Sequence, residues 1–384
     1  MCISLIYYEP SKTKSNYIFI FAHNRDEYFD RPSKPISMYS NSDIISGIDT
    51  TIDKEGGTWL GISKKNGKIA TILNIPTKRK PNIYINLPEI LNKNTKRGFI
   101  VNDFLADVDP DKNSIMKCEK LFNEKYYNQP FHLIGTSSFP YKINSLNFKQ
   151  QNSDTSYYSG LYYYNNETHM KHSKFINLMP DIYCFGNSKY PETSLLKNKS
   201  NSKPKWSKLL RAKKIFEKIL FNDYDITTNF GNKDQILASL MNELLLDHLK
   251  CPDPVFEKEL SEEYNFTAKE ISSKSAIFVQ PFINDYIIPD EGAKNVGKEK
   301  NSDSDFGKLG RVYGTRCRTV ILVDKNGNVD IREASLKPEY LRRFGQVKID
   351  WQTGINSEQE FDGEQYSYNE ADWVVTNVSF KIGE

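Results

Sequence analysis

The chain has 384 residues but only five cysteines and five histidines, and none of its apolar runs is long. The cysteines are scattered and odd in number, which predicts free thiols in a reducing compartment rather than a disulfide framework. The longest apolar runs, such as residues 17–22, have the length of a strand, so we expect no transmembrane segment. There is also no glycine-rich phosphate loop of standard spacing. These absences argue against a disulfide-rich scaffold, an integral membrane protein and a P-loop or dinucleotide-binding enzyme.

The N-terminus lacks the basic stretch and the long apolar segment of a signal peptide, which predicts a cytoplasmic protein. The formal net charge is only +3, and no basic stripe or nucleic-acid motif is present, so we expect no nucleic-acid partner. His169 and His172 form the one closely spaced histidine pair, and their polar setting favours a loop over a metal or haem site. We therefore expect no metal and no stable cofactor.

Secondary-structure signals run from strands to helices and back to strands. β-Branched and aromatic residues predict strands over residues 3–8, 17–22, 59–62, 68–74, 131–135, 161–165, 276–279, 319–324 and 329–333. Apolar stripes of helical spacing predict helices over 206–220 and 234–248, and 95–120 also has helical character. Because few strand–helix units alternate, this order predicts a layered α+β fold rather than a doubly wound parallel sheet.

Three polar stretches interrupt this pattern. They are rich in Lys, Asn, Ser and Asp, which is typical of surface loops rather than core elements. We predict a single domain over residues 1–384, with polar insertions at about 189–205 and 290–309 and a C-terminal extension from about 344 that holds the stretch 352–370.

Cys2 directly follows Met1 and opens the first predicted strand. Met1 is normally removed when the next residue is as small as cysteine, which would leave a free α-amine on the residue that carries the thiol. An α-amine titrates at about 8 and a thiol at about 8.5, so this amine can accept the thiol proton near neutral pH. That is the chemistry of N-terminal-nucleophile (Ntn) hydrolases. The alternative is that Cys2 is a small buried hydrophobe at a strand end.

Polar residues follow directly on the second predicted strand. If the chain stays extended there, Arg25 and Glu27 share one face and Asn24 and Asp26 share the other. An arginine near a thiol lowers the thiol pKa and can orient a substrate carboxylate or carbonyl. The alternative is a salt-bridged strand end with no role in a site.

Two later segments carry further candidates. Asn187 follows a strand, and a strand-end asparagine can donate its side-chain amide to an oxyanion, although an ordinary turn has the same signature. Strand alternation places Arg316 and Arg318 on one face, where they could hold an anion. The alternative for this pair is a solvated outer face of the strand.

Taken together, these residues resemble the NRDE family, also known as transport and Golgi organisation protein 2. The tetrapeptide Asn24-Arg25-Asp26-Glu27 is the string for which the family is named. Further family blocks follow in family order: Met1-Cys2-Ile3, Arg31-Pro32-Ser33-Lys34, Ile45-Ser46-Gly47-Ile48-Asp49, Glu55-Gly56-Gly57-Thr58-Trp59-Leu60-Gly61-Ile62-Ser63, Val279-Gln280-Pro281, Tyr313-Gly314-Thr315-Arg316 and Ile321-Leu322-Val323-Asp324. One block would be weak evidence, and the ordered set is specific.

The resemblance implies an Ntn-like fold, a four-layer αββα sandwich of two antiparallel sheets with flanking helices. The family is similar in outline to cysteine Ntn amidohydrolases such as penicillin V acylase, bile salt hydrolase and acid ceramidase. On that similarity, Cys2 corresponds to the nucleophile and Arg25 to a strand-end arginine. The segments at Asn74 and Asn187 correspond to the two oxyanion donors.

One position departs from those enzymes. Their arginine is followed three positions later by an acid, whereas this chain has Tyr28 there, so the acid that would hold the α-amine is unassigned. Their late arginine corresponds to either Arg316 or Arg318.

The resemblance also implies roles in Golgi organisation and secretory transport and in lipid or haem homeostasis, in the cytoplasm, mitochondria or Golgi. We therefore expect a factor that handles a small ligand such as haem or an acyl lipid. The ligand-binding candidates are Asn24, Asp26, Glu27, Arg316 and Arg318. The alternative is a cysteine amidohydrolase that cleaves a C–N amide bond with Cys2, and a third possibility is a scaffold in which these residues serve packing alone.

Overall fold

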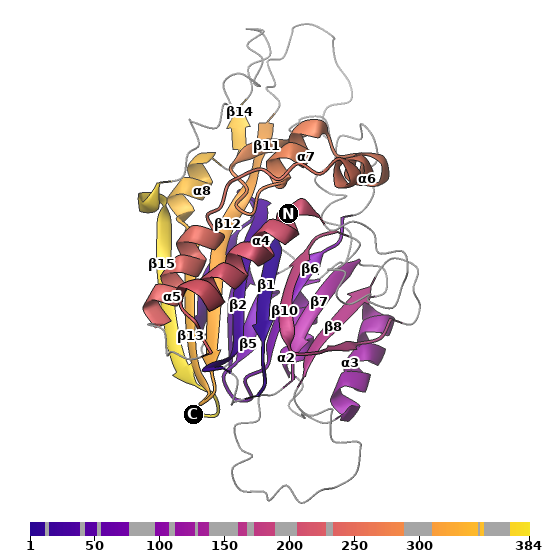
Figure 1. Cartoon of the computed structure of the whole chain (residues 1–384). Coiled ribbons are helices and arrows are strands. Elements are labelled where there is room, and N and C mark those ends of the chain that lie inside the picture. Colours follow the sequence, from indigo (N-terminus) through magenta and orange to yellow (C-terminus); the bar gives the residue numbers. More distant parts are fainter. Residues whose placement is uncertain are drawn as a thin grey trace, which may run out of the picture.

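Two antiparallel β-sheets pack face to face, with helices on both outer sides (Figure 1). A computed structural model of the chain describes residues 1–11, 15–38, 43–51, 55–76, 97–106, 112–126, 130–137, 160–166, 173–188, 206–227, 233–287, 309–344, 346–348 and 369–384. The predicted insertion at 189–205, all of the predicted insertion at 290–309 except residue 309, the stretch 352–368, and His169 and His172 lie outside these residues.

The first sheet holds both the N-terminal strand and the motif strand. Its order is β10 (Asp181–Gly186), β1 (Ile3–Tyr8), β2 (Tyr17–Tyr28), β12 (Leu309–Asp324), β13 (Asn328–Leu336) and β15 (Trp373–Lys381). Two further strands, β11 (Phe282–Ile287) and β14 (Gln346–Lys348), pair with β12. The register of β1 on β2 places Ile3 opposite Asn24, so the first two residues of the chain lie beside the motif.

In the second sheet, strands that are consecutive in the sequence are neighbours. Its order is β3 (Ser33–Met38), β4 (Ile44–Asp49), β5 (Leu60–Ser63), β6 (Ile69–Asn74), β7 (Phe131–Thr136), β8 (Leu161–Asn166) and β9 (Ile176–Leu178). Gly67, with φ of 72°, turns the chain between β5 and β6, where the sequence predicts a tight turn.

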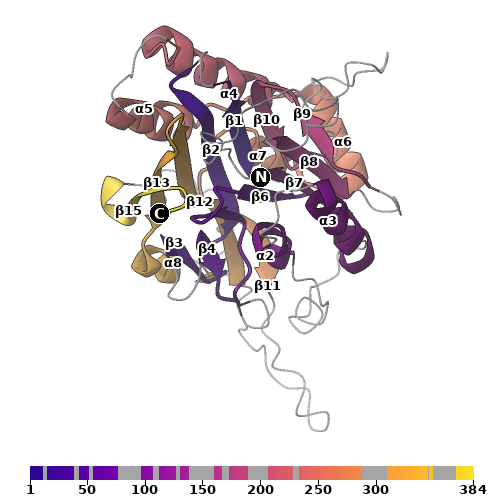
Figure 2. The ribbon, with the colours of Figure 1, turned by 90° about the horizontal axis from the view of Figure 1, so that it is seen from below.

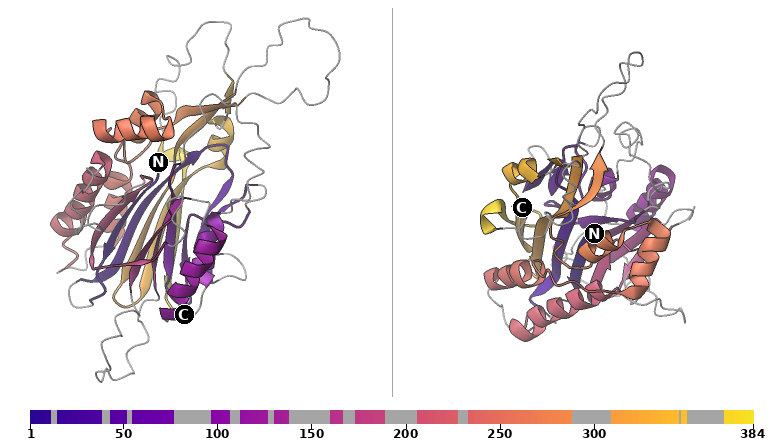
Figure 3. Two further views of the ribbon diagram at one scale, coloured as in Figure 1. Left: turned by 90° about the vertical axis from the view of Figure 1, so that its right-hand side faces the viewer. Right: turned by 90° about the horizontal axis from the view of Figure 1, so that it is seen from above.

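Helices cover the outer face of each sheet (Figures 2 and 3). The second sheet is covered by α2 (Gly98–Ala106) and α3 (Lys112–Lys125). The outer face of the first sheet is covered by α4 (Ser207–Glu217), the π-helical turn η3 (Lys218–Asp223), α5 (Lys233–Ser239), the π-helical turn η4 (Leu240–Leu244), α6 (Pro254–Tyr264) and α7 (Ala268–Lys274). Helix α8 (Pro338–Phe344) lies away from α4 and α5, near β3 (Figure 2). A 3-10 turn, η5 (Glu370–Asp372), precedes β15.

Three apolar clusters separate these layers. One lies between the helices and the first sheet, one between the two sheets, and one between the second sheet and α2 and α3. The predicted α+β sandwich of two antiparallel sheets with flanking helices is therefore confirmed. No helix among the described residues is long and apolar enough to cross a membrane.

Some predicted elements differ from the structure. The strand expected over 276–279 is a loop, and the strand after it is β11. The helical region expected over 95–120 contains two helices, α2 and α3. The strand predicted over 17–22 continues to Tyr28. That extension carries all four motif residues into the centre of the first sheet.

Candidate functional site

The motif residues lie on the last third of β2, where the strand runs between β1 and β12. The strand remains extended, so the predicted alternation holds. Asn24 and Asp26 point toward the helices that cover the first sheet, whereas Arg25 and Glu27 point toward the second sheet.

Asn24 links the first sheet to the helical layer through two side-chain hydrogen bonds. Its Nδ2 donates to the carbonyl oxygen of Leu245 at 2.9 Å and to that of Ile277 at 3.0 Å. The amide thus satisfies one carbonyl at the end of η4 and another in the loop after α7. Both acceptors are buried with it, so these two bonds satisfy carbonyl groups that water does not reach.

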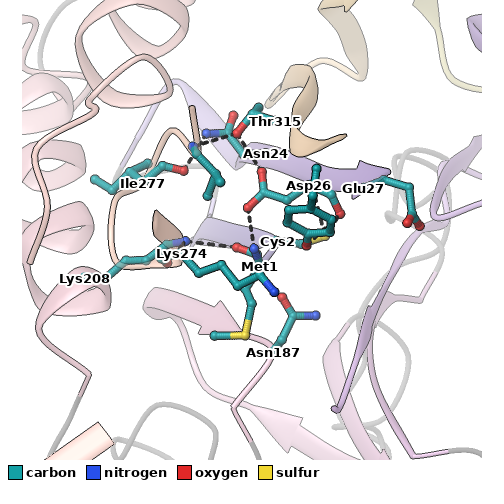
Figure 4. Close-up of polar contacts among 12 residues, drawn as sticks. Met1, Cys2, Asn24, Asp26, Glu27, Asn187, Lys208, Lys274, Ile277 and Thr315 are labelled. Atoms are coloured by element: carbon teal, nitrogen blue, oxygen red, sulfur yellow. Dashed lines mark hydrogen bonds and ion pairs between the residues drawn. The ribbon is translucent and has the colours of Figure 1, made fainter. Parts of the chain in front are cut away.

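Asp26 is the acid that holds the N-terminal amine (Figure 4). Its Oδ2 lies 2.7 Å from the ammonium of Met1, and its Oδ1 accepts from the hydroxyl of Thr315 at 2.6 Å. Both members of the ion pair are buried. Burial lowers the pKa of the Met1 ammonium to about 6, against the opposing attraction of Asp26. The sequence comparison left this role unassigned.

A buried lysine lies on the other side of Met1. Nζ of Lys208, on α4, donates to the Met1 carbonyl oxygen at 2.9 Å. Burial lowers the pKa of Lys208. Residue 1 is thus held at its amine by Asp26 and at its carbonyl by Lys208, and only 4% of its surface is exposed.

The thiol of Cys2 packs against the backbone of β2. The N–H of Asp26 donates to Sγ at 3.3 Å, and Sγ lies 3.5 Å from the Asp26 carbonyl oxygen. Burial and the nearby Asp26 raise the pKa of Cys2. With Met1 in place the thiol is therefore protonated at neutral pH and is not activated.

Cys2 opens onto a small cavity of about 110 Å³, here called the polar cavity. Its wall is formed by Cys2, His23, Arg25, Asp26, Glu27, Arg31, Asp49, Gly57, Thr58, Trp59, Ile72, Asn74, Arg97, Gly98 and Phe99. Three of the residues predicted to be catalytic, Cys2, Arg25 and Asn74, therefore share one cavity.

Asn187, the fourth predicted catalytic residue, adjoins this cavity. The register of β10 on β1 pairs Gly186 with Ile3, so Asn187 lies next to the strand end at Cys2. Its Nδ2 donates to the Asn74 carbonyl oxygen at 2.6 Å. His132 holds the following residue in place, with Nε2 2.7 Å from the Ser188 carbonyl oxygen. The sequence reasoning did not identify this histidine.

Arg316 and Arg318 do not share a face, in contrast to the prediction. The pairing of β12 with β2 shifts between Thr315 and Cys317, so Arg316 is an extra residue that reverses the alternation. Arg316 donates to the carbonyl oxygens of Tyr28 and Arg31.

Arg318 points the other way, toward the helices. Its Nη1 donates to the Met241 carbonyl oxygen at 3.0 Å, and its guanidinium lies 4.5 Å from the centre of the Trp373 ring. It is therefore separated by the sheet from the side on which Arg25 lies.

A second, larger cavity of about 400 Å³ lies on the same side of the sheet as Arg25, and is here called the apolar cavity. Its wall is formed by Arg25, Phe29, Asp30, Pro32, Ser33, Lys34, Pro35, Thr50, Trp59, Arg316, Cys317, Ser335, Leu336, Pro338, Leu341, Arg342 and Val374. Arg25 stacks on Trp59, with 3.9 Å between the guanidinium carbon and the ring centre. Both residues also line the polar cavity, so this stack is the wall between the two cavities.

Glu27 belongs to an ion-pair network rather than to a free surface. Arg31 lies 2.6 Å from Glu27 and 2.5 Å from Asp49. Although burial opposes ionisation, the guanidinium groups of Arg31 and Arg25 lower the pKa of Glu27 to about 2. No group of His, Cys, Asp and Glu side chains suited to a metal ion occurs among the residues that the structure describes.

The fold and the site together define a four-layer α+β protein with a cysteine as its second residue and a buried carboxylate at its N-terminus. Residues 1–338 match the family model described as Transport and Golgi organisation 2. The chain therefore belongs to this family, which the NRDE motif also indicates.

Individual relatives show the same relationship. The chain is 28% identical to the human Transport and Golgi organization protein 2 homolog over 90% of its own length and 96% of the human protein. It is 27% identical to the bovine homolog over 88% of this chain and 93% of the relative. The Drosophila melanogaster protein of that name is 28% identical over 38% of this chain and 50% of its own length.

Proposed function

We propose that the protein binds an apolar molecule with an anionic group in the apolar cavity, and that it acts in Golgi organisation and secretory transport from the cytoplasm. The observation that carries the first part is a cavity of about 400 Å³ in which buried Arg25 and Arg316 are set into a largely apolar wall. The printed names of the relatives support the second part.

The charge of Arg316 favours an anionic group on the ligand. Only 3% of Arg316 is exposed, and its Nε has no hydrogen-bond partner among the residues that the structure describes. Among the described residues no carboxylate lies within ion-pair distance of Arg316 or Arg25. A buried, unpaired guanidinium is costly, and a ligand carboxylate beside it would offset that cost.

The rest of the wall favours an acyl chain. Phe29, Leu336, Leu341 and Val374 give the cavity an apolar surface, which is typical of sites that bury a hydrocarbon. Haem is the weaker candidate, because the described part of the wall holds no histidine or methionine. Its one thiol, Cys317, has a pKa raised well above the usual value by burial, which disfavours a thiolate ligand to iron.

The test is a calorimetric titration of the full-length protein with palmitate and, separately, with haem. Arg316→Gln should weaken palmitate binding by about tenfold to a hundredfold, as expected for loss of one charged hydrogen-bonding partner. Arg211→Gln, which removes a surface ion pair with Asp247, is the matched control and should leave the affinity unchanged. The proposal fails if the wild-type protein binds neither probe, or if Arg316→Gln binds palmitate as tightly as the wild type.

A second candidate function is that of a cysteine amidohydrolase. It is favoured by the convergence of Cys2, Arg25 and Asn74 on one cavity and by the contact of the Cys2 thiol with the backbone of Asp26, which keeps that carboxylate near the Cys2 amine. Once Met1 is removed, the Cys2 α-amine would take the thiol proton, and the thiolate would attack the amide carbonyl carbon. The protonated amine would then give its proton to the leaving amine, and water would hydrolyse the thioester to release the acid.

The oxyanion donors in this scheme are two side chains. The N–H of Ile75 already donates to the Pro130 carbonyl oxygen at 3.2 Å, which leaves the Asn74 amide for this role together with Asn187. Arg25 would orient the substrate.

The intact mass of the protein from its own cells tests this candidate. The mechanism requires that Met1 is absent and the amine of Cys2 is free, so a retained Met1 or an acetylated Cys2 rules it out. With a free amine, Cys2→Ala should abolish hydrolysis of amide substrates and leave palmitate binding intact. That contrast separates the two candidate functions.

A further inference from the structure

We infer that the polar cavity beside Cys2 is a binding site for a phosphate group. This goes beyond the proposed function, which places an anionic amphiphile in the apolar cavity. Three features of the cavity support this inference: two arginines with no carboxylate partner among the described residues, the buried ring of His23, and the start of helix α2.

Two arginines of this cavity have no carboxylate partner within the described residues. Arg31 is shared between Glu27 and Asp49, whereas no ion pair joins Arg25 or Arg97 to a described acid. Arg97 donates a long hydrogen bond, 3.4 Å, to the Pro130 carbonyl oxygen. Burial and the neighbouring Arg31 lower its pKa to about 10. Two guanidinium groups that face one cavity are a common means of holding an oxyanion.

A buried histidine supplies a further donor. His23 is 1% exposed and lines the polar cavity. Its Nδ1 lies 2.9 Å from the Ser4 hydroxyl, and its Nε2 has no hydrogen-bond partner in the part of the chain that the structure describes. If the Ser4 hydroxyl donates to Nδ1, the ring proton lies on Nε2 and needs an acceptor. An oxygen of a bound anion would provide that acceptor.

Helix α2 begins at this cavity. Arg97, Gly98 and Phe99 form part of the wall, so the positive end of the helix dipole faces the space between the arginines. A Cβ on Gly98 would lie 2.9 Å from the Cα of Gly57. Only glycine therefore lets the helix start come this close to the loop that holds Gly57 and Thr58.

The size and the donor set both favour phosphate over a larger anion. A volume of about 110 Å³ leaves room for a small polyatomic group, since one water needs about 10–15 Å³ of comparable space. Donors from two arginines, a histidine and a helix start exceed what a carboxylate with two oxygens can accept, whereas a phosphate has more oxygens to offer.

Such a phosphate could be a free ion or the head group of a lipid. A lipid head group fits this arrangement because the polar cavity adjoins the apolar cavity at Arg25 and Trp59. An amphiphile could place its phosphate in one cavity and its chain in the other. The two sources are separated by the probes below.

The test is calorimetric titration of the full-length protein with inorganic phosphate, lysophosphatidic acid and palmitate. Arg97→Gln should weaken binding of both phosphate probes by about tenfold or more, and Arg97→Lys should restore part of the affinity. Arg211→Gln is the control. Lysophosphatidic acid that binds more tightly than inorganic phosphate identifies a lipid head group, and equal affinities identify the free ion.

The inference is overturned if the wild type binds neither phosphate probe, or if a folded Arg97→Gln or Arg97→Lys protein binds them as well as the wild type. Palmitate binding should be unaffected by Arg97→Gln and reduced by Arg316→Gln. Failure of the palmitate proposal would therefore leave the phosphate site standing, and the reverse also holds.

Discussion

At the scale of single residues, the four-residue motif divides into two pairs with different tasks. Asn24 and Asp26 hold the helical layer and the N-terminus in place through buried hydrogen bonds and an ion pair. Arg25 and Glu27 face the cavities, where one stacks on Trp59 and the other pairs with Arg31. Loss of the first pair should therefore appear mainly as lost stability, and loss of the second as lost binding.

Asp26→Asn should destabilise the protein by about 1–3 kcal/mol. The reason is that the buried N-terminal amine and the Thr315 hydroxyl lose the carboxylate that accepts their hydrogen bonds. Urea denaturation followed by circular dichroism measures this change. Glu262→Gln removes an exposed ion pair with Lys258 and should cost less than about 1 kcal/mol. Equal effects from the two substitutions would contradict this assignment.

The two buried histidines make stability depend on pH. Burial lowers the pKa of His23 and of His132 from 6.5 to about 4, so between these values the unfolded chain binds more protons than the folded one. Stability should therefore fall as the pH drops from 6.5 toward 4.

His132→Gln should reduce the slope of unfolding free energy against pH by about 1.4 kcal/mol per pH unit. Tyr163→Phe is the control, because it removes the hydrogen bond to His132 but no group that titrates in this range. Denaturation at several pH values gives both slopes. An unchanged slope in His132→Gln would show that this histidine is not held neutral.

The sequence identified three residues of the polar cavity but left the role of one buried acid unassigned. Cys2, Arg25 and Asn74 were predicted together and do share a cavity, which leaves their chemistry to be tested. The role of Asp26 was missed because it depends on the register that places residue 1 opposite residue 26, and register is not visible in a local pattern.

At the scale of elements, one extra residue in β12 places Arg316 and Arg318 on opposite sides of the first sheet. The shift at Arg316 sends its side chain to the apolar cavity while Arg318 stays with the helices. Sequence alternation cannot detect such a bulge, because it assumes an uninterrupted strand. The loop over 276–279 was mistaken for a strand for a related reason. Its backbone bonds to the side chains of Asn24 and Thr315, and it has single backbone bonds to Thr315 and Asp247 rather than a continuous strand ladder.

A glycine in β4 makes room for the stack that separates the cavities. A Cβ on Gly47 would overlap the indole of Trp59, so Gly47→Ala should cost about 1–3 kcal/mol through overpacking. It should also move Trp59 away from Arg25 and weaken palmitate binding. Urea denaturation and calorimetry measure the two effects.

Met38→Ala, on the exposed side of the adjacent strand β3, serves as the control for this prediction. Met38 is 58% exposed, so its substitution should change stability by no more than about 0.5 kcal/mol. A Gly47→Ala protein that is as stable as the wild type would show that the indole has space to move.

At the scale of the whole molecule, the chain begins in one sheet, builds the other, and returns to complete the first. β1 and β2 lie in the first sheet, β3 to β9 form the second, and β10 to β15 return to the first. Shared apolar packing between the sheets ties the two halves of the chain together. The layered fold could be predicted because apolar patterning is local, whereas this interleaving emerges only from the strand pairings.

The interleaving predicts that the chain unfolds as one unit. Far-ultraviolet circular dichroism and tryptophan fluorescence should report the same urea midpoint, because Trp59 lies at the inter-sheet stack while Trp206 and Trp373 belong to the layer beneath the helices. Two separate midpoints would mean that the sheets unfold independently, and that the predicted single domain over 1–384 is wrong.

The most direct test of the proposed function is a crystal structure of the full-length protein with palmitate. We expect a carboxylate within hydrogen-bond distance of Arg316 and Arg25, and a hydrocarbon chain along Leu336 and Leu341. A palmitate found elsewhere, or an apolar cavity left without it at a concentration that saturates the protein in solution, would contradict the proposed function.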